Sequence, residues 1–317
     1  MAYSAGDPIL DDEYNTFVNS SSDPFGYNHF AGPGSGQYGL NQSTIATVSA
    51  GDTVNASSWN ALFTGMDNIA NHTNTSITAS SVSAGDTIAI RSALISDLAN
   101  LAAAVAGGST SATALGTNAV GSSTSAATYN TSATIERSVT FANNNTMRAF
   151  FNAGGKIRID PSVTTGIDGS KDDVFNDLTV TATGNLDIGS LASTRSGSGE
   201  TLTTNGLGLG FHDLTDSYQT ILKLTSDNSG YTSNTVEYFA KLDAAVASAT
   251  VITIKMVATD AAADTTFTAG NTDGVAANPN EAPKITLALI EVHPTNAQGL
   301  ASNIQSASNA EVSNSTS

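Results

Sequence analysis

The carboxyl-terminal half of the chain alternates apolar and polar residues with a period of two. In residues 250–257, Ile252, Ile254 and Met256 fall on one face, and Thr253 and Lys255 fall on the other. Successive side chains of a β-strand point to opposite faces, so this alternation indicates strands with one buried face. Gly, Asn and Asp clusters separate such segments. The expected strands are residues 139–141, 156–159, 178–182, 201–204, 218–224, 235–241, 250–257 and 284–292.

About eight strands with no long helical pattern between them favour an antiparallel β-sandwich or jelly-roll-like domain over an α/β fold. We therefore expect a mainly β chain whose sandwich covers residues 135–293. Residues 1–106 read as an N-terminal assembly region of short helices and turns. Residues 107–134 are almost entirely Gly, Ser, Thr, Ala and Asn, which is typical of a linker. Residues 294–317 lose the alternation and are expected to form a polar tail.

The N-terminal region repeats one hexapeptide pattern three times. Each copy reads Ser-Ala-Gly-Asp, then one further residue and a β-branched residue, and the copies begin at Ser4, Ser49 and Ser83. Gly-Asp favours a tight turn, and a segment with helical spacing of apolar residues follows each copy. The pattern predicts three turn-plus-helix units.

Two arrangements of these helices are open. They can pack on each other as a small helical subdomain, or they can serve as arms whose apolar stripes pack on neighbouring subunits, because short helices bury little surface alone. The candidate assembly-interface residues are the apolar side chains of the three stripes: Tyr14, Phe17, Trp59, Leu62, Phe63, Leu94, Leu98 and Leu101.

Residues 137–159 are predicted to form a strand, a short helix and a second strand. Asn143 and its neighbours can cap the helix start, and Gly154 and Gly155 can end it because glycine tolerates positive φ. We interpret the stretch as a corner of the core. Its candidate anchor residues are Met147, Phe150, Phe151, Gly154, Gly155, Ile157 and Ile159.

The same stretch resembles a module found in virion structural proteins of tailed bacteriophages, particularly marine and cyanobacterial phages. The resemblance lies in residues 139–159, centred on the sequence AFFNAGG at residues 149–155. Residues 13–15 and 58–62 resemble the N-terminal region of the same proteins, and the likeness extends to about Val292. It implies a non-enzymatic structural component of the tail, neck or fibre apparatus, assembled in the host cytoplasm and located in the virion.

Other roles stay open beside this one. A glycan- or receptor-binding adhesin module of a phage fibre would need an aromatic platform beside Asn and Asp, and Tyr231 with residues 271–274 (NTDG) supplies parts of one. A capsid decoration protein is a further alternative. A polysaccharide-degrading tail-spike would need a well-placed carboxylate pair, which we do not find in the sequence.

Charge restricts the partners. The chain has 28 acidic and 11 basic residues and a formal net charge of −17, so phosphate groups of nucleic acid or of an anionic membrane would be repelled. We expect other copies of the chain, in a trimer or a ring, and other virion proteins as partners. Four basic residues lie in the central stretch, either as solvated tips or as contacts for an acidic partner: Arg137, Arg148, Lys156 and Arg158.

The sequence offers little catalytic chemistry. Without cysteine there is no disulfide, zinc–thiolate site or cysteine nucleophile, and the four histidines are far apart. Asp168, Asp172 and Asp173 are weak metal candidates because their spacing lacks the closing glutamate of an EF-hand loop. No signal peptide or membrane span is recognisable, so we expect a soluble product. We expect no enzyme activity, catalytic residue or cofactor.

Overall fold

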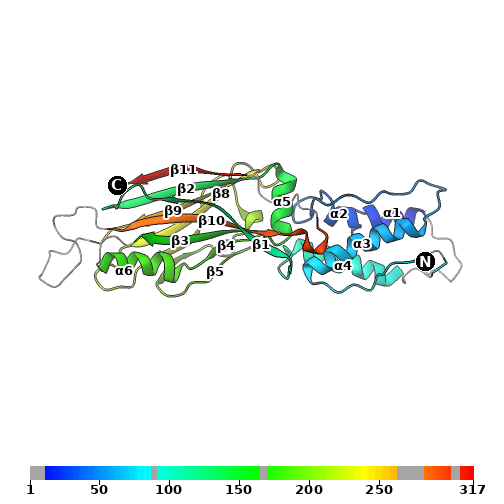
Figure 1. Cartoon of the computed structure of the whole chain (residues 1–317), viewed down its shortest axis with the longest axis horizontal. Coiled ribbons are helices and arrows are strands. Elements are labelled where there is room, and N and C mark those ends of the chain that lie inside the picture. Colours follow the sequence, from blue (N-terminus) through cyan, green and yellow to red (C-terminus); the bar gives the residue numbers. More distant parts are fainter. Residues whose placement is uncertain (1–10, 84, 87–90, 165–169, 263–281, 301–307) are drawn as a thin grey trace, which may run out of the picture. The chain divides into compact units, whose positions relative to one another are not determined.

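The structure is a computed structural model that describes residues 11–83, 85–86, 91–164, 170–262, 282–300 and 308–317 (Figure 1). The chain divides into two compact units, and each unit is built from three separate segments. The chain therefore passes from one unit to the other five times. Unit 1 comprises Met1–Gly116, Asn143–Gly155 and His293–Gln305, and unit 2 comprises Thr117–Ala142, Lys156–Val292 and Ser306–Ser317.

Unit 2 contains two antiparallel sheets (Figure 1), which confirms the predicted mainly β, sandwich-like class preceded by helices. The five-stranded sheet has the order β1 (Leu115–Thr124), β10 (Lys284–Pro294), β3 (Lys156–Thr164), β4 (Leu186–Ile188) and β5 (Ser193–Arg195). The six-stranded sheet has the order β11 (Ser308–Thr316), β2 (Ser132–Thr140), β9 (Val251–Thr259), β8 (Thr235–Leu242), β7 (Gln219–Thr225) and β6 (Thr201–Asn205).

The period-two pattern sets the inner face of the six-stranded sheet. On β8, Val236, Tyr238 and Ala240 are buried while the residues between them are only partly covered. Tyr238 pairs with Met256 of β9, which is buried as well. A slip of one residue would move each of these apolar side chains to the outer face, so burial fixes the register.

One expected strand is a helix. Residues 178–182 lie in the π-helix η1 (Asp177–Ala182), which directly follows α6 (Ser170–Asn176). The side chains of Val174, Leu178 and Ala182 recur every four residues and are all buried, whereas Val180 is exposed. This helical stripe accounts for more burial than the Leu-Thr-Val-Thr alternation that suggested a strand.

Four strands lie where the sequence predicted none. β1 falls within the expected linker, β11 lies in the expected polar tail, and β4 and β5 are only three residues each. β11 pairs with β2 from Ser308 to Thr316, although its side chains are mostly exposed. Main-chain pairing rather than apolar burial therefore holds β11, and such a strand leaves no hydrophobic alternation in the sequence.

Unit 1 is helical and has its own core. Its helices are α1 (Asp11–Asn19), α2 (Tyr27–Ala31), α3 (Ala56–Thr73), α4 (Arg91–Ala106), α5 (Asn144–Asn152) and the 3₁₀-helix η3 (Asn296–Gln298). The rings of Tyr14 and Trp59 meet edge to face with centroids 5.2 Å apart. All eight candidate assembly-interface residues belong to this core and are at most 4% exposed. The structure therefore favours the helical-subdomain arrangement over exposed arms.

The repeated hexapeptide forms the predicted turn in its second copy. The Asp52 amide donates to the Ser49 carbonyl at 3.0 Å, and the Ser49 amide donates to the Asp52 carboxylate at 3.2 Å. The Ser83 amide donates likewise to the Asp86 carboxylate, at 2.7 Å. Gly51 has φ +88°, which explains why the pattern needs glycine there. The first copy, and part of the third, lie outside the described residues.

Asparagine side chains attach extended segments to the helices of unit 1. Asn60 of α3 donates from Nδ2 to the Val82 carbonyl and accepts from the Val82 amide, both at 2.8 Å. One side chain thus satisfies both polar backbone groups of an extended residue, as a neighbouring strand would. The same pair of bonds joins Asn15 to Val48 and Asn28 to Ile45.

The helix of the central stretch belongs to unit 1, whereas the strands on either side belong to unit 2. Asn143 caps α5 by accepting from the Thr146 amide, and Gly154 after the helix has φ +87°, both as predicted. Ala149 of the helix and Ala153 directly after it are part of the unit 1 core. The expected sandwich boundary at residues 135–293 therefore has to exclude α5.

Replacing Phe150 by alanine is expected to lower the free energy of unfolding by about 3–5 kcal/mol, because the ring is fully buried and packs edge to face on Phe151 at 5.1 Å. Urea unfolding followed by circular dichroism measures the change. Val180→Ala is the control: its side chain is 39% exposed, and the loss should stay within about 0.5 kcal/mol. Equal midpoints for Phe150→Ala and the wild type would contradict the anchor role.

Candidate partner-binding surface

The four basic residues of the central stretch were the first candidates for an acidic partner. Arg137 of β2 is buried, and its guanidinium donates to the Ser122 carbonyl at 3.0 Å, the Ser123 hydroxyl at 2.5 Å and the Asn309 side chain at 2.6 Å. These acceptors lie on β1 and β11. Arg137 thus bonds a main-chain and a side-chain oxygen of β1 and a side-chain oxygen of β11, and it is not a solvated strand tip.

Arg148 of α5 is also buried, and burial lowers its pKa from the ordinary value. Its Nη2 donates to the carbonyls of Pro33 and Gly34 and to the Asn145 side chain, the last at 2.9 Å. Asn152, on the same helix, donates from Nδ2 to two further carbonyls of this loop. Arg148 therefore holds a loop of unit 1 in place.

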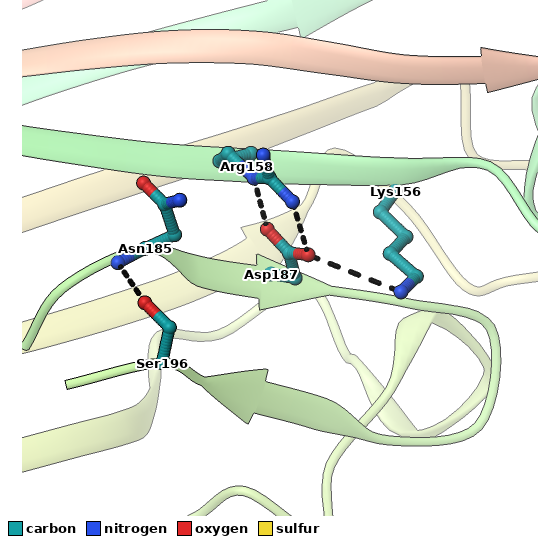
Figure 2. Close-up of polar contacts among 5 residues, drawn as sticks. All are labelled: Lys156, Arg158, Asn185, Asp187 and Ser196. Atoms are coloured by element: carbon teal, nitrogen blue, oxygen red, sulfur yellow. Dashed lines mark hydrogen bonds and ion pairs between the residues drawn. The ribbon is translucent and has the colours of Figure 1, made fainter. Parts of the chain in front are cut away.

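Arg158 and Lys156 share one carboxylate within unit 2 (Figure 2). Arg158 Nε lies 2.7 Å from Asp187 Oδ1, Arg158 Nη2 lies 2.9 Å from Asp187 Oδ2, and Lys156 Nζ lies 3.9 Å from Oδ2. The hydrogen bond to Asp187 raises the pKa of Arg158. Figure 2 also shows the main-chain N–H of Asn185 donating to the Ser196 hydroxyl, at 2.8 Å. The acidic group that Arg158 binds is thus Asp187 of its own chain, and not an external partner.

A second group of basic residues, which the sequence reasoning missed, lies in the six-stranded sheet. Lys255 Nζ is 3.9 Å from the ring centroid of Tyr218 and 4.4 Å from that of Phe239, and Lys241 Nζ is 4.5 Å from Tyr218. We call Tyr218, Phe239, Lys241 and Lys255 the lysine–aromatic cluster. Aromatic faces attract ammonium groups and fix their position.

The alternation along β8 and β9 puts this cluster on the outer face. Phe239 and Lys241 alternate with the buried residues of β8, and Lys255 pairs directly with Phe239 across the strands. Glu136 of β2 pairs with Lys255 on the other side. Burial, and secondarily the charge of Glu136, raises the pKa of Tyr218. The outward period-two positions are the sequence signal that could have found this cluster.

The remaining lysine of this sheet is different. Lys223 of β7 is paired with Glu237 of β8, with Nζ 3.1 Å from Oε2. Thr220 also donates to Glu237, at 2.8 Å. Lys223 Nζ thus contacts a carboxylate, whereas the ammonium groups of Lys241 and Lys255 lie over aromatic rings, so Lys223 serves as a comparison for those two lysines.

The metal candidates of the sequence lie in different environments. Asp168 lies outside the described residues, Asp172 is buried in α6, and Asp173 is exposed. Within the described part of the chain, no group of three or more His, Asp or Glu side chains could hold a metal ion.

The other candidates give no binding platform. Tyr231 is buried, and residues 271–274 lie outside the described residues. Among the histidines, which the sequence did not single out, His72 is buried with Nε2 2.8 Å from the Ala153 carbonyl oxygen. Burial lowers the pKa of His72, and the hydrogen bond opposes this shift. Among the helices that the structure describes, none is long and apolar enough to cross a membrane.

Comparison with known proteins adds no relative. No protein-family model, no curated protein and no solved structure matches this chain.

Proposed function

We propose that this chain is a non-enzymatic structural component of a bacteriophage virion, in the tail, neck or fibre apparatus. The observation that carries the proposal is the stretch of residues 139–159, which resembles a module of such proteins. Its apolar anchors are all buried, as expected of a core element: Met147, Phe150, Phe151, Ile157 and Ile159. The same stretch contributes α5 to unit 1 and strands to unit 2.

The path of the chain supports a mechanical role. Because each unit is built from three segments, five chain crossings join the two units. A pulling force between them is shared by several crossings, whereas two domains in simple succession share one linker. This property suits a part of a particle that transmits force.

The proposed partners are other copies of the chain, in a trimer or a ring, and other virion proteins. A chain with a net charge of −17 is itself an acidic partner for the lysine–aromatic cluster of a second copy. Charge complementarity of this kind favours encounter and fixes orientation. The same charge opposes nucleic acid and anionic membranes.

Two related roles share these features. A glycan- or receptor-binding fibre module could use the lysine–aromatic cluster as its binding surface, and such binding would be detected on a glycan array. A capsid decoration protein would differ in its position on the particle. Both would still place the chain in a virion.

Mass spectrometry of phage particles purified by density gradient tests the proposal directly. The chain is expected to co-purify with major virion proteins in a constant ratio across the particle peak. A matched lysate from which particles have been removed is the control. Presence of the chain in the lysate with none in the particle peak would contradict the virion role.

Association in solution tests the proposed self-contact. The wild-type chain is expected to form oligomers by light scattering, and Lys241→Ser combined with Lys255→Ser should reduce the mass because the partner's acidic groups lose their counter-charges. Lys223→Ser is the matched control and should leave association unchanged, since Lys223 is paired with Glu237. A monomeric wild type, or identical masses for all variants, would rule out this contact.

A further inference from the structure

A buried ion pair connects two elements of unit 2 that are distant in the sequence. Lys171 on α6 and Asp260 immediately after β9 have Nζ and Oδ2 2.9 Å apart. Their side chains are 4% and 1% exposed, compared with 31% and 19% for Lys223 and Glu237. The Lys171–Asp260 pair is therefore removed from water, and the Lys223–Glu237 pair is not.

The surroundings of this pair are fixed and partly apolar. Asp172 is buried beside Lys171 in sequence, and the fully buried Tyr129 ring packs on Phe175 with centroids 5.5 Å apart. Burial, and then the charges of Asp260 and Asp172, raise the pKa of Tyr129, so both carboxyl groups lie near this phenol. The Asp260 amide donates to the Thr131 carbonyl at 2.8 Å, which holds Asp260 by its backbone.

Burial makes the neutral forms of a lysine and an aspartic acid more accessible than they are in water. Removing an ammonium and a carboxylate from water costs several kcal/mol per ion, and one proton transfer converts the pair into an amine and a carboxylic acid. A desolvated lysine amine is a nucleophile. Oδ2 is bonded directly to the carboxyl carbon of Asp260, so the contact at 2.9 Å holds the amine next to an electrophilic carbon. Holding two reacting groups together favours an intramolecular reaction.

We propose that Lys171 and Asp260 become joined by an intramolecular isopeptide bond. The ammonium first gives one proton to the carboxylate, and the neutral Nζ then attacks the carboxyl carbon to form the C–N bond. The C–O bond to one carboxyl oxygen breaks, and that oxygen leaves as water with the transferred proton and a second proton from Nζ. The reaction consumes the ion pair, yields one amide and one water, and needs no oxidant or reductant.

The bond would act as a covalent staple in a chain without cysteine. Lys171 and Asp260 are 89 positions apart, so the bond closes a long loop between α6 and the end of β9. Closing a long loop restricts the unfolded chain, as a disulfide does. The water-excluded site protects the amide from hydrolysis.

Peptide mapping of the purified full-length chain tests the proposal. After denaturation and proteolysis, tandem mass spectrometry is expected to find a branched peptide that links Lys171 to Asp260 and is lighter than its two linear parts by one water. Intact mass alone is insufficient, because a succinimide at Asp168-Gly169 or Asp273-Gly274 would also lose one water. Trypsin should not cleave after Lys171 in the linked form.

Substitutions at Lys171 and Asp260 test whether these two side chains form the bond. Lys171→Arg and Asp260→Ala should each abolish the branched peptide, and Lys223→Arg, at the solvated pair, should retain it in the same amount as the wild type. Recovery from the wild-type chain of linear peptides alone, with Lys171 and Asp260 unmodified, would overturn the proposal and leave the pair as an ordinary buried ion pair. A branched peptide that persists in Asp260→Ala would overturn it as well.

Discussion

Hydrogen bonding of the main chain by side chains is the interaction on which both units depend. In unit 1, Asn60 satisfies both backbone groups of Val82, so an extended segment with no strand beside it can stay packed on a helix. In unit 2, the buried Asn234 accepts from the amides of Ala261 and Ala262, at 2.9 and 2.8 Å. Buried polar backbone groups are costly when unpaired. A chain with 12% charged residues meets this requirement with side-chain amides and with the buried guanidinium groups of Arg137 and Arg148.

The fold class was predictable because burial leaves a pattern. The alternation of Ile252, Ile254 and Met256 places one face of β9 in the core, and the structure has this strand where it was expected. Strand β11 was not predicted because it has no apolar alternation. Main-chain pairing and the hydrogen bond between Arg137 and Asn309 hold it instead. Residues 178–182 were misread because Leu178 belongs to two patterns, a strand-like alternation and a four-residue helical stripe.

The candidate sites were harder to predict because they join residues that are distant in the sequence. Arg158 and Asp187 meet only because β3 and β4 pair, and no local pattern shows that pairing. Lys171 stood inside the acidic run considered for a metal, yet its partner Asp260 lies 89 positions further on. Helix α5 carried the right local signals, a capping Asn143 and Gly154, and these signals cannot reveal which unit the helix joins. Local chemistry predicts elements, and the tertiary fold decides which charges meet.

Electron cryomicroscopy of intact phage particles tests the virion role most directly. The account predicts density in the tail, neck or fibre apparatus, repeated by the particle's symmetry, into which the five-stranded and six-stranded sheets of unit 2 fit with side-chain density for the Phe150–Phe151 stretch. A map in which other chains explain all of the tail, neck, fibre and capsid density, with no site for this sequence, would contradict it.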